Sequence, residues 1–310
     1  MYPLKFKPIY KERIWGGQKL QELFGRDLPE GRQIGESWEL ADLPEDKSEI
    51  VNGPFAGQTI DEVLDRYGKE ITGKPDYSRP FPLLIKFLDA EEILSVQVHP
   101  DEAACRRMGK GQPKTECWYI LDAQPDSFIY KGLREGTTKE QFALAVKNGT
   151  VEQFLRKAPV ARGQCHFLPS GTCHAIGPGL VIAEIQQPSD TTYRVFDWNR
   201  VDPKTGKGRQ LHIDDALESI HFDSGELPVR TSGRLVESSE FVVDKKHGHA
   251  GEETAIGRGK MKVIIVIAGK GSFADSQRVS FIKGDTLLIP FDYEGAMRFE
   301  EETEYLSVGI

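Results

Sequence analysis

Short runs in which apolar and polar side chains alternate dominate this chain and limit what it can fold into. They are rich in β-branched and aromatic residues and lie at 81–88 (FPLLIKFL), 93–99 (ILSVQVH), 116–121 (ECWYIL), 127–130 (SFIY), 164–169 (QCHFLP), 180–186 (LVIAEIQ) and 192–198 (TYRVFDW). A period of two is that of a half-buried strand, because successive side chains of a strand point to opposite faces. Glycine and proline interrupt the runs at LPSGT and IGPGL, which predicts turns. We therefore expect a mainly β fold.

Helix signals are fewer. The segment 59–71 (TIDEVLDRYGKEI) opens with Thr59 and Glu62 at the spacing of a capping box. The segment 138–149 opens in the same way with a threonine and a glutamine, and it closes on Asn-Gly, which favours a helix end. A third, short helix is expected over 214–220 (DDALESI).

The chain has 310 residues, which is enough for two domains of ordinary size. Residues 222–233 (FDSGELPVRTSG) have the composition of a linker, and strand-like runs resume after them at 262–274, 278–291 and 304–310. We expect a first domain at 1–225 with helices inserted in and around it, and a second domain at 226–310.

Charge and apolar patterning exclude several classes of function. The net charge of −8 is the opposite of what a nucleic-acid binder usually carries. The first residues contain no long apolar run of a signal peptide, and the most apolar run, 263–268, is too short to cross a bilayer. The four cysteines form no CxxC pair, so we expect reduced thiols in a cytoplasmic protein and no cysteine-based zinc site.

The stretch SVQVHPDE places two polar side chains together on one strand. Gln97 and His99 alternate with Val96 and Val98, so they share a face, and Pro100 predicts that the strand ends there. Further along, Glu116 begins the strand-like run ECWYIL. Each of these residues alone has an ordinary structural explanation, such as a hydrogen-bonded core histidine.

A motif further along the chain suggests that these residues act together. Residues 163–174 (GQCHFLPSGTCH) read Gly, five residues, Pro, one residue, Gly, two residues and His174, which resembles the second motif of the cupins, double-stranded β-helix (jelly-roll) proteins. Residues 284–290 (GDTLLIP) repeat its first part without the histidine. The fold class we expect is therefore two cupin domains, of which only the first holds a metal ion. Gln97, His99, Glu116 and His174 would be its ligands.

A longer resemblance makes the expectation specific. The segments PLKFKPIYKERIWGG, IGESWEL, FPLLIKFLDA, LSVQVHPDE, KTECWYIL, FLPSGTCHAIG and AEIQQPSDTTYRVFDWNR occur in the order seen in type I mannose-6-phosphate isomerases of the short bacterial form. The resemblance covers about the first two thirds of the chain. It implies a zinc-dependent aldose–ketose isomerase with one Zn²⁺ per chain, held by Gln97, His99, Glu116 and His174, that interconverts mannose 6-phosphate and fructose 6-phosphate.

The same resemblance identifies Arg194 as the active-site arginine and brings Glu184 and Lys114 into the pocket. Glu184 would act as the base or as a partner of a ligand histidine. Lys114 would contact the phosphate or a sugar oxygen, unless it is a solvated lysine. Arg194 would clamp the phosphate, stabilise the enediolate, or only form an ion pair with Asp190 or Asp197.

Two other functions compete with the isomerase. An iron(II) cupin oxygenase would use two histidines and one carboxylate, and a fourth ligand at Gln97 counts against it. A non-catalytic sugar-binding cupin would not need the complete ligand set and Arg194. We expect a phosphosugar substrate, no nucleic-acid or membrane partner, and a monomer or weak homo-oligomer.

Overall fold

The computed structural model describes residues 1–201, 206–274 and 277–310, which form four antiparallel sheets and a few helices. Two facing sheets build the first lobe. Sheet I has the order β12 (Tyr193–Phe196), β5 (Val96–Val98), β10 (His174–Ile176), β7 (Phe128–Leu133), β8 (Leu155–Pro159). Sheet II has the order β2 (Ile9–Gly17), β3 (Ile34–Leu40), β4 (Leu84–Ala90), β11 (Leu180–Gln186), β6 (Glu116–Ala123), β9 (Cys165–Leu168). Each of the seven runs singled out in the sequence contains a strand of this lobe.

Two further sheets build the second lobe. Sheet III has the order β1 (Leu4–Lys5), β19 (Thr286–Ile289), β16 (Lys262–Ala268), β21 (Thr303–Gly309), β14 (Val242–Gly248), β13 (Arg234–Glu237). Sheet IV has the order β15 (Glu253–Ile256), β20 (Gly295–Phe299), β17 (Lys270–Phe273), β18 (Ser280–Ile282). Strand β1 comes from the start of the chain but pairs with β19, so the second lobe also contains residues from the segment assigned to the first domain. The boundary between residues 225 and 226 otherwise stays a prediction.

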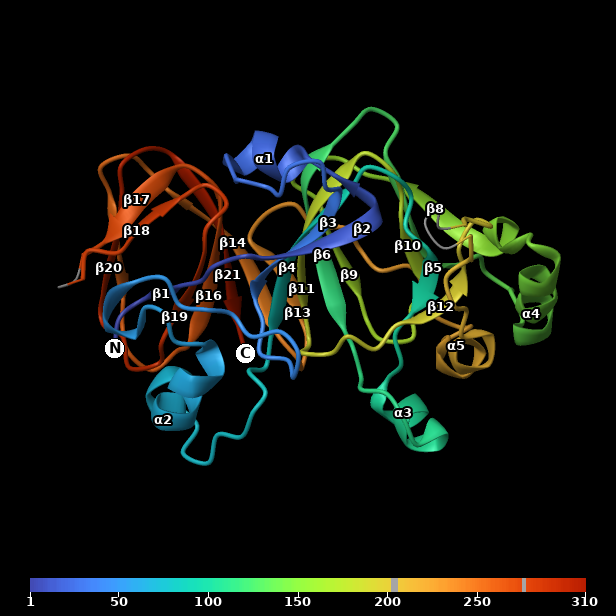
Figure 1. Ribbon diagram of the computed structural model, residues 1–310, viewed down its shortest axis with the longest axis horizontal. Coiled ribbons are helices and arrows are strands. Elements are labelled where there is room, and N and C mark those ends of the chain that lie inside the picture. The colour runs from blue at the N-terminus through green and yellow to red at the C-terminus, as the bar shows by residue number, and fades with distance from the viewer. Residues whose placement is uncertain (202–205, 275–276) are drawn as a thin grey trace.

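The sheets are stacked side by side, so that the molecule has the layers sheet I, sheet II, sheet III and sheet IV from one end to the other (Figure 1). Helices α4 (Lys139–Asn148) and α5 (Ile213–Ser219) cover the outer face of sheet I, where Phe142 and Ala216 join one core with Val96 and Tyr130. Helix α2 (Ile60–Thr72) lies beside the second lobe (Figure 1). The fold is the mainly β, jelly-roll fold that the sequence predicted.

The central strands β4 and β11 of sheet II are buried on both faces, and this explains why they read as nearly continuous apolar runs. Every residue of β4 and of β11 is buried. Ile85 and Phe87 of β4 belong to the core shared with the second lobe, whereas Leu88 packs in the core between sheets I and II. Between them, Lys86 points toward sheet I and pairs with Glu184 across the ladder. The barrel interior therefore has an apolar end and a polar end.

The three predicted helices are present. Helix α2 begins after Thr59, with the capping box to Glu62 that the sequence predicted. Helix α4 has the second capping box, from Thr138 to Gln141, and ends at Gly149 in the left-handed conformation with φ of 70°. Residues 213–219 form α5, which begins one residue before the predicted segment.

Two helices and two 3₁₀ turns were not predicted. Helix α3 (Glu102–Met108) follows directly on HPDE: the side chain of Asp101 accepts a hydrogen bond from the backbone N–H of Ala104 at 2.6 Å, and Gly109 ends the helix with φ of 66°. This cap and stop were readable from the sequence. The remaining short elements are α1 (Lys19–Phe24), η1 (Gly53–Phe55) and η2 (Val151–Phe154).

Candidate metal centre and adjoining cavity

Three side chains of the metal-binding type meet between sheets I and II. His174 begins β10, His99 follows the end of β5, and Glu116 begins β6 on the facing sheet. All three are at most 2% exposed. The Nε2 atoms of His99 and His174 lie 3.3 and 3.5 Å from the carboxylate oxygens of Glu116, and the candidate ligand atoms all lie within 4.8 Å of one another. This is the one such group of three in the part of the chain that the structure describes.

Backbone carbonyls fix the orientation of both imidazoles. Nδ1 of His99 donates to the carbonyl of Thr191 at 2.8 Å, and Nδ1 of His174 donates to the carbonyl of Thr172 at 2.9 Å. Because a carbonyl can only accept, each ring carries its proton on Nδ1 and turns the lone pair of Nε2 toward Glu116. This arrangement is the usual support of a metal-ligating histidine.

The cluster is rich in electron pairs. Burial, followed by the nearby Lys114 ammonium, lowers the pKa of His99 to about 4, and burial also lowers the pKa of His174, so both rings are neutral near pH 7. Burial alone would raise the pKa of Glu116, but Lys114 and the two histidines outweigh it and hold that pKa well below its usual range. Two lone pairs and a carboxylate thus face one another.

The donor set fits a cation. Nε2 of His99 and both carboxylate oxygens of Glu116 are buried without a hydrogen bond of good geometry, which is costly unless a positive charge stabilises them. The Nζ atom of Lys114 lies 2.8 Å from Oε2 of Glu116, so one ammonium already reaches the cluster. Imidazole nitrogens and a carboxylate are the ligand types that zinc and related divalent ions take.

Gln97 lies next to this cluster on β5. It is opposite His174 on one side of the ladder and opposite Arg194 on the other. The amide Nε2 is 3.4 Å from Nε2 of His174, and the amide oxygen accepts from the Ser95 hydroxyl at 3.3 Å. Rotation of the terminal amide exchanges its oxygen and nitrogen, so Gln97 is able to offer an oxygen ligand here.

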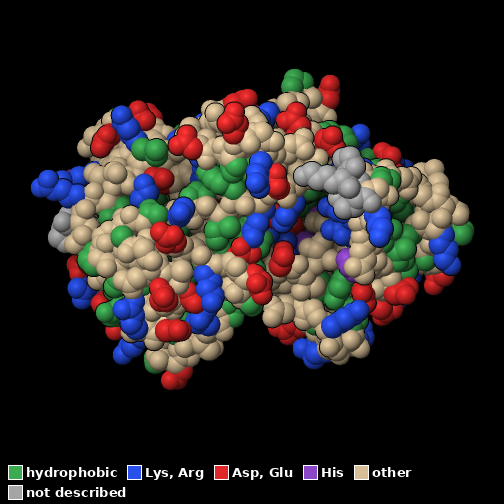
Figure 2. Space-filling model, viewed as in Figure 1, with side chains coloured by type: hydrophobic (Ala, Val, Ile, Leu, Met, Phe, Trp, Pro, Cys, Tyr) green, Lys and Arg blue, Asp and Glu red, His purple; other side chains and the backbone are tan. Residues whose placement is uncertain are grey.

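A polar cavity of about 410 Å³ adjoins the cluster, and Gln97 and Lys114 line it. Its other charged lining residues are the cations Arg13, Lys86, Arg194, Arg209 and the acids Glu36, Glu184, Asp190. The space-filling view shows lysine and arginine side chains gathered around a hollow in this half of the molecule, with a histidine visible within it (Figure 2). The volume suits a small molecule.

Arg194 differs from the other cations of the cavity. Its Nε donates to the Ser95 hydroxyl at 3.2 Å and its Nη1 donates to the carbonyl of Gln210 at 2.9 Å. Within the described residues, no carboxylate lies at ion-pair distance from Arg194. Asp197, one of the expected partners, instead pairs with Arg200 and Arg209 at 2.5 and 2.6 Å. Burial, and after it the charge of Arg209, lowers the pKa of Arg194.

Glu184 has two partners in sheet II. The indole Nε1 of Trp118 donates to one carboxylate oxygen at 3.1 Å, and the Lys86 ammonium lies 3.5 Å from the other. Among the described residues, no hydrogen bond or ion pair joins Glu184 to His99 or His174, so its direct support of a ligand histidine stays a prediction. The link is indirect, because the Trp118 ring meets His174 edge to face at 5.2 Å between centroids.

Sequence reasoning missed several charged residues of the cavity. Lys86 interrupts the apolar run LLIKFL, and a charge inside a buried strand was a signal that could have found it. Arg13 and Glu36 form an ion pair at 2.9 Å between neighbouring strands of sheet II. No local signal distinguishes Arg209, which lies in an irregular segment.

A jelly-roll lobe with a buried His–Glu–His group beside a charged cavity has the fold of a cupin and a candidate metal site within it. The family model for phosphomannose isomerase type I, catalytic domain, matches residues 3–116. Mannose-6-phosphate isomerase ManA of Bacillus subtilis is 38% identical over 302 residues, covering 93% of both chains. The probable mannose-6-phosphate isomerase GmuF of the same organism is 42% identical over 231 residues, covering 73% of this chain and 72% of that one.

The solved structures agree. The crystal structure of the mannose 6-phosphate isomerase from Bacillus subtilis has a TM-score of 0.87 at 30% identity and covers 100% of both chains. The chain belongs to the type I phosphomannose isomerase family.

We expect the cluster to bind about one divalent ion per chain, and His174→Ala to lose that ion because a buried imidazole donor is removed. Removal of a residue that only hydrogen-bonds to a metal ligand weakens metal affinity roughly 10–100-fold, so removal of a ligand itself should weaken it at least as much. Elemental analysis after exhaustive dialysis measures the content. His247→Ala is the matched control, because His247 is an exposed histidine of the second lobe. Two ions per chain, or equal metal content in His174→Ala, would contradict this assignment.

Proposed function

We propose that the protein is a zinc-dependent isomerase that interconverts mannose 6-phosphate and fructose 6-phosphate through a cis-enediol. The observation that carries the proposal is the continuity of the site: Gln97 and Lys114 line the cavity and also contact the His–Glu–His cluster. Membership of the family and the names of the relatives support the same reaction.

The reaction explains why such a site is needed. A proton moves between C2 and C1 of the sugar while the carbonyl moves the other way. This requires a base, a positive charge near the oxygen that becomes negative, and contacts that hold the phosphate. A cavity that places buried cations beside a cation-binding cluster can supply both the positive charge near the oxygen and the contacts that hold the phosphate.

The ligand set favours zinc. Two neutral imidazoles, one neutral amide and one carboxylate would leave a net charge of plus one on a divalent ion. When bound, zinc supplies a Lewis acid for the developing oxyanion and has no redox chemistry. An iron(II) oxygenase needs open positions, and Gln97 as a fourth ligand would occupy one of them. A zinc site in the first lobe alone agrees with the sequence, because the repeated motif GDTLLIP in the second lobe is not followed by a histidine.

We assign Arg194 to the enediolate. It is half-buried in the cavity, and the neighbouring cations Arg13, Lys86 and Arg209 each have a carboxylate partner whereas Arg194 has none within the described residues. An unpaired guanidinium in such a place is available for negative charge on the substrate. The active-site role implied for this residue by the family resemblance favours the reacting oxygen over the phosphate.

Lys114 and Glu184 receive supporting roles. The Lys114 ammonium, held beside Glu116, is placed to contact a sugar oxygen or the phosphate. Both oxygens of Glu184 are engaged by Trp118 and Lys86, which favours a positioning role over that of the base. Through these partners Glu184 would hold the wall of the cavity and, by way of Trp118, the His174 ring.

A cytoplasmic setting and a monomeric or weakly associating chain complete the proposal. All four cysteines are free thiols, as expected in a reducing compartment. No helix within 1–201, 206–274 or 277–310 is long and apolar enough to cross a membrane. Light scattering on the purified protein gives the oligomeric state.

A coupled assay that follows fructose 6-phosphate formed from mannose 6-phosphate tests the function. We expect activity that disappears after treatment with a chelator and returns when zinc is added back. The same samples in an oxygen electrode should consume no oxygen with candidate substrates. Turnover that survives complete metal removal, or oxygen uptake restored by iron(II), would refute the proposal.

The amide of Gln97 should set the charge of the site. We expect Gln97→Glu to bind zinc as tightly as the parent protein or more tightly, and to turn over more slowly. The added carboxylate would lower the site charge from plus one to zero and so weaken oxyanion stabilisation. A competitive zinc-chelator titration reads the affinity and the coupled assay reads kcat. Full kcat in the zinc-loaded variant would rule out the electrostatic role.

Arg194→Ala should reduce kcat by about 10²–10³-fold with little change in KM, which is the range for the loss of one oxyanion donor. Arg106→Ala is the control, because Arg106 is an exposed arginine on α3. Zinc content and circular dichroism establish that the variant is folded and loaded. Near-normal kcat with a much larger KM would move Arg194 to the phosphate.

A further inference from the structure

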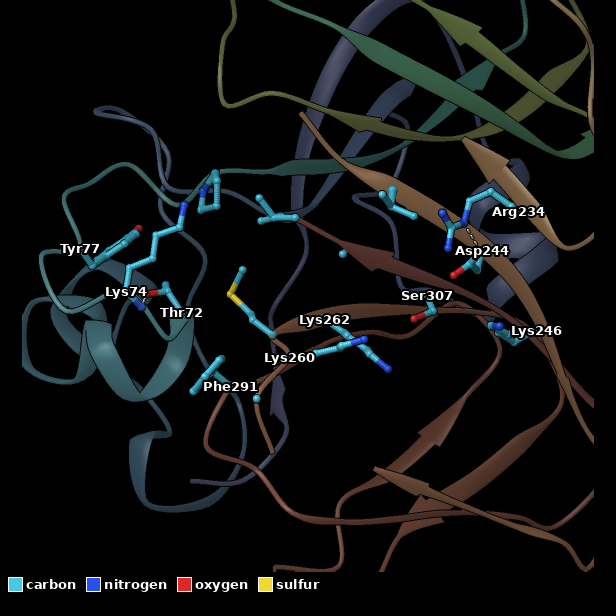
Figure 3. Close-up of a pocket in the computed structure, with 16 residues that line it drawn as sticks. Thr72, Lys74, Tyr77, Arg234, Asp244, Lys246, Lys260, Lys262, Phe291 and Ser307 are labelled. Carbon is cyan, nitrogen blue, oxygen red and sulfur yellow. Dashed lines mark hydrogen bonds and ion pairs between the residues drawn. The ribbon is translucent and has the colours of Figure 1, made fainter. Parts of the chain in front are cut away.

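A second cavity, of about 450 Å³, lies away from the metal cluster on the second lobe. It is bounded on one side by the end of α2 and the segment that follows it, and on the other by strands of sheet III (Figure 3). Lys74 and Tyr77 come from the first side, whereas Arg234 and Lys246 come from β13 and β14. The proposed isomerase reaction does not use this cavity.

The charge of the cavity is unusual for this chain. Five cationic side chains line it, namely Lys74, Arg234, Lys246, Lys260, Lys262, and the single lining carboxylate side chain is Asp244. Asp244 is already paired with Arg234 at 2.6 Å. Within the described residues, none of the four lysines has a carboxylate at ion-pair distance. A protein with a net charge of −8 thus concentrates unpaired positive charge in one hollow.

Strand geometry holds these lysines together. Val242, Asp244 and Lys246 alternate along β14 and share the face of sheet III that borders the cavity. Lys262 is the first residue of β16. Ile264, the next residue on the same face of that strand, is paired with Ser307 of β21. Burial lowers the pKa of Lys262, and the charges of Lys260 and Lys246 lower it further. The lysines therefore repel one another, and a bound anion would remove that repulsion.

The other end of the cavity is apolar and fixed in place. Tyr77, Met261 and Phe291 line it next to the end of α2. The backbone N–H of Phe291 donates to the carbonyl of Ile71, the second-to-last residue of α2, at 2.8 Å. In the close-up, Lys260 and Lys262 lie between this aromatic end and the strands that carry Arg234, Asp244 and Lys246 (Figure 3). The cavity therefore offers two rings and Lys74 at one end, and the other cations from its middle to the opposite end.

We propose that this cavity binds a phosphorylated metabolite of nucleotide size, with its phosphates on the lysine cluster and its planar group against Tyr77 and Phe291. Phosphate oxygens are strong acceptors for ammonium groups, and the unpaired Lys246, Lys260 and Lys262 supply three of them. The volume lies in the range of small-molecule sites. The inference rests on the second lobe alone and does not depend on the proposed reaction.

Calorimetric titration of the purified full-length, metal-loaded protein with ATP in excess Mg²⁺ tests the site. We expect saturable binding of one ATP per chain that weakens as NaCl is raised from low to physiological concentration, because salt screens exposed charges. The double variant Lys246→Gln/Lys262→Gln should bind at least about 10-fold more weakly, since two charged contacts are lost. Lys270→Gln, an exposed lysine of β17 outside the cavity, is the matched control and should bind as the parent does.

Two further titrations separate the alternatives. Inorganic pyrophosphate should bind more weakly than ATP, because it lacks a planar group, and equal or tighter binding would overturn the assignment to a nucleotide. Arg194→Ala should keep its affinity for ATP, and a loss there with retention in the double variant would place the ligand in the first cavity. Absence of binding at millimolar ATP and pyrophosphate would overturn the proposal altogether.

Discussion

The central strands of sheet II, β4 and β11, are buried on both faces, and the arrangement of the two lobes and of the site follows from this burial. One face is largely apolar, because it packs on the second lobe, and Ile85 and Phe87 lie on this face. The other face encloses the barrel interior, where polar groups are tolerated only if each has a partner. Lys86 and Glu184 satisfy this condition by pairing across the β4–β11 ladder. The polar end of the barrel is thus built from charges that the sheet itself places opposite one another.

The site follows from this pairing. When most charges of the cavity are neutralised within the protein, the groups left over are available for chemistry. Two such groups stand out: the His99–Glu116–His174 cluster, whose lone pairs converge, and Arg194, which has no carboxylate partner among the described residues. The carbonyls of loop residues complete the cluster by fixing the tautomer of each imidazole. The groups to which we assign the reaction are thus those whose charges or lone pairs the fold leaves unpaired.

The two cavities differ in how many of their charged side chains are paired within the protein. In the first, four of the five cations, Arg13, Lys86, Lys114 and Arg209, are paired with acids, which leaves one arginine and a cluster of lone pairs. In the second, on the exposed face of sheet III, Arg234 is the only cation with a carboxylate partner among the described residues, and Lys246, Lys260 and Lys262 repel one another. The first cavity has an excess of electron pairs, which suits a metal ion. The second has an excess of positive charge, which suits a phosphorylated ligand.

Local patterns in the sequence were enough to predict the strands and the three residues of the candidate metal cluster. Alternation and turn residues are local, so the strand runs, the capped helices and the residues His99, Glu116 and His174 were readable from short segments. The cap of α3 was also readable and was missed. Only the tertiary structure placed β1 in the sheet of the second lobe, brought Arg13 and Arg209 into the first cavity, and gathered Lys74 with lysines far along the chain. These juxtapositions arise when the sheets pack against one another. The residues next to a given position in the chain do not show which sheet will pack against it.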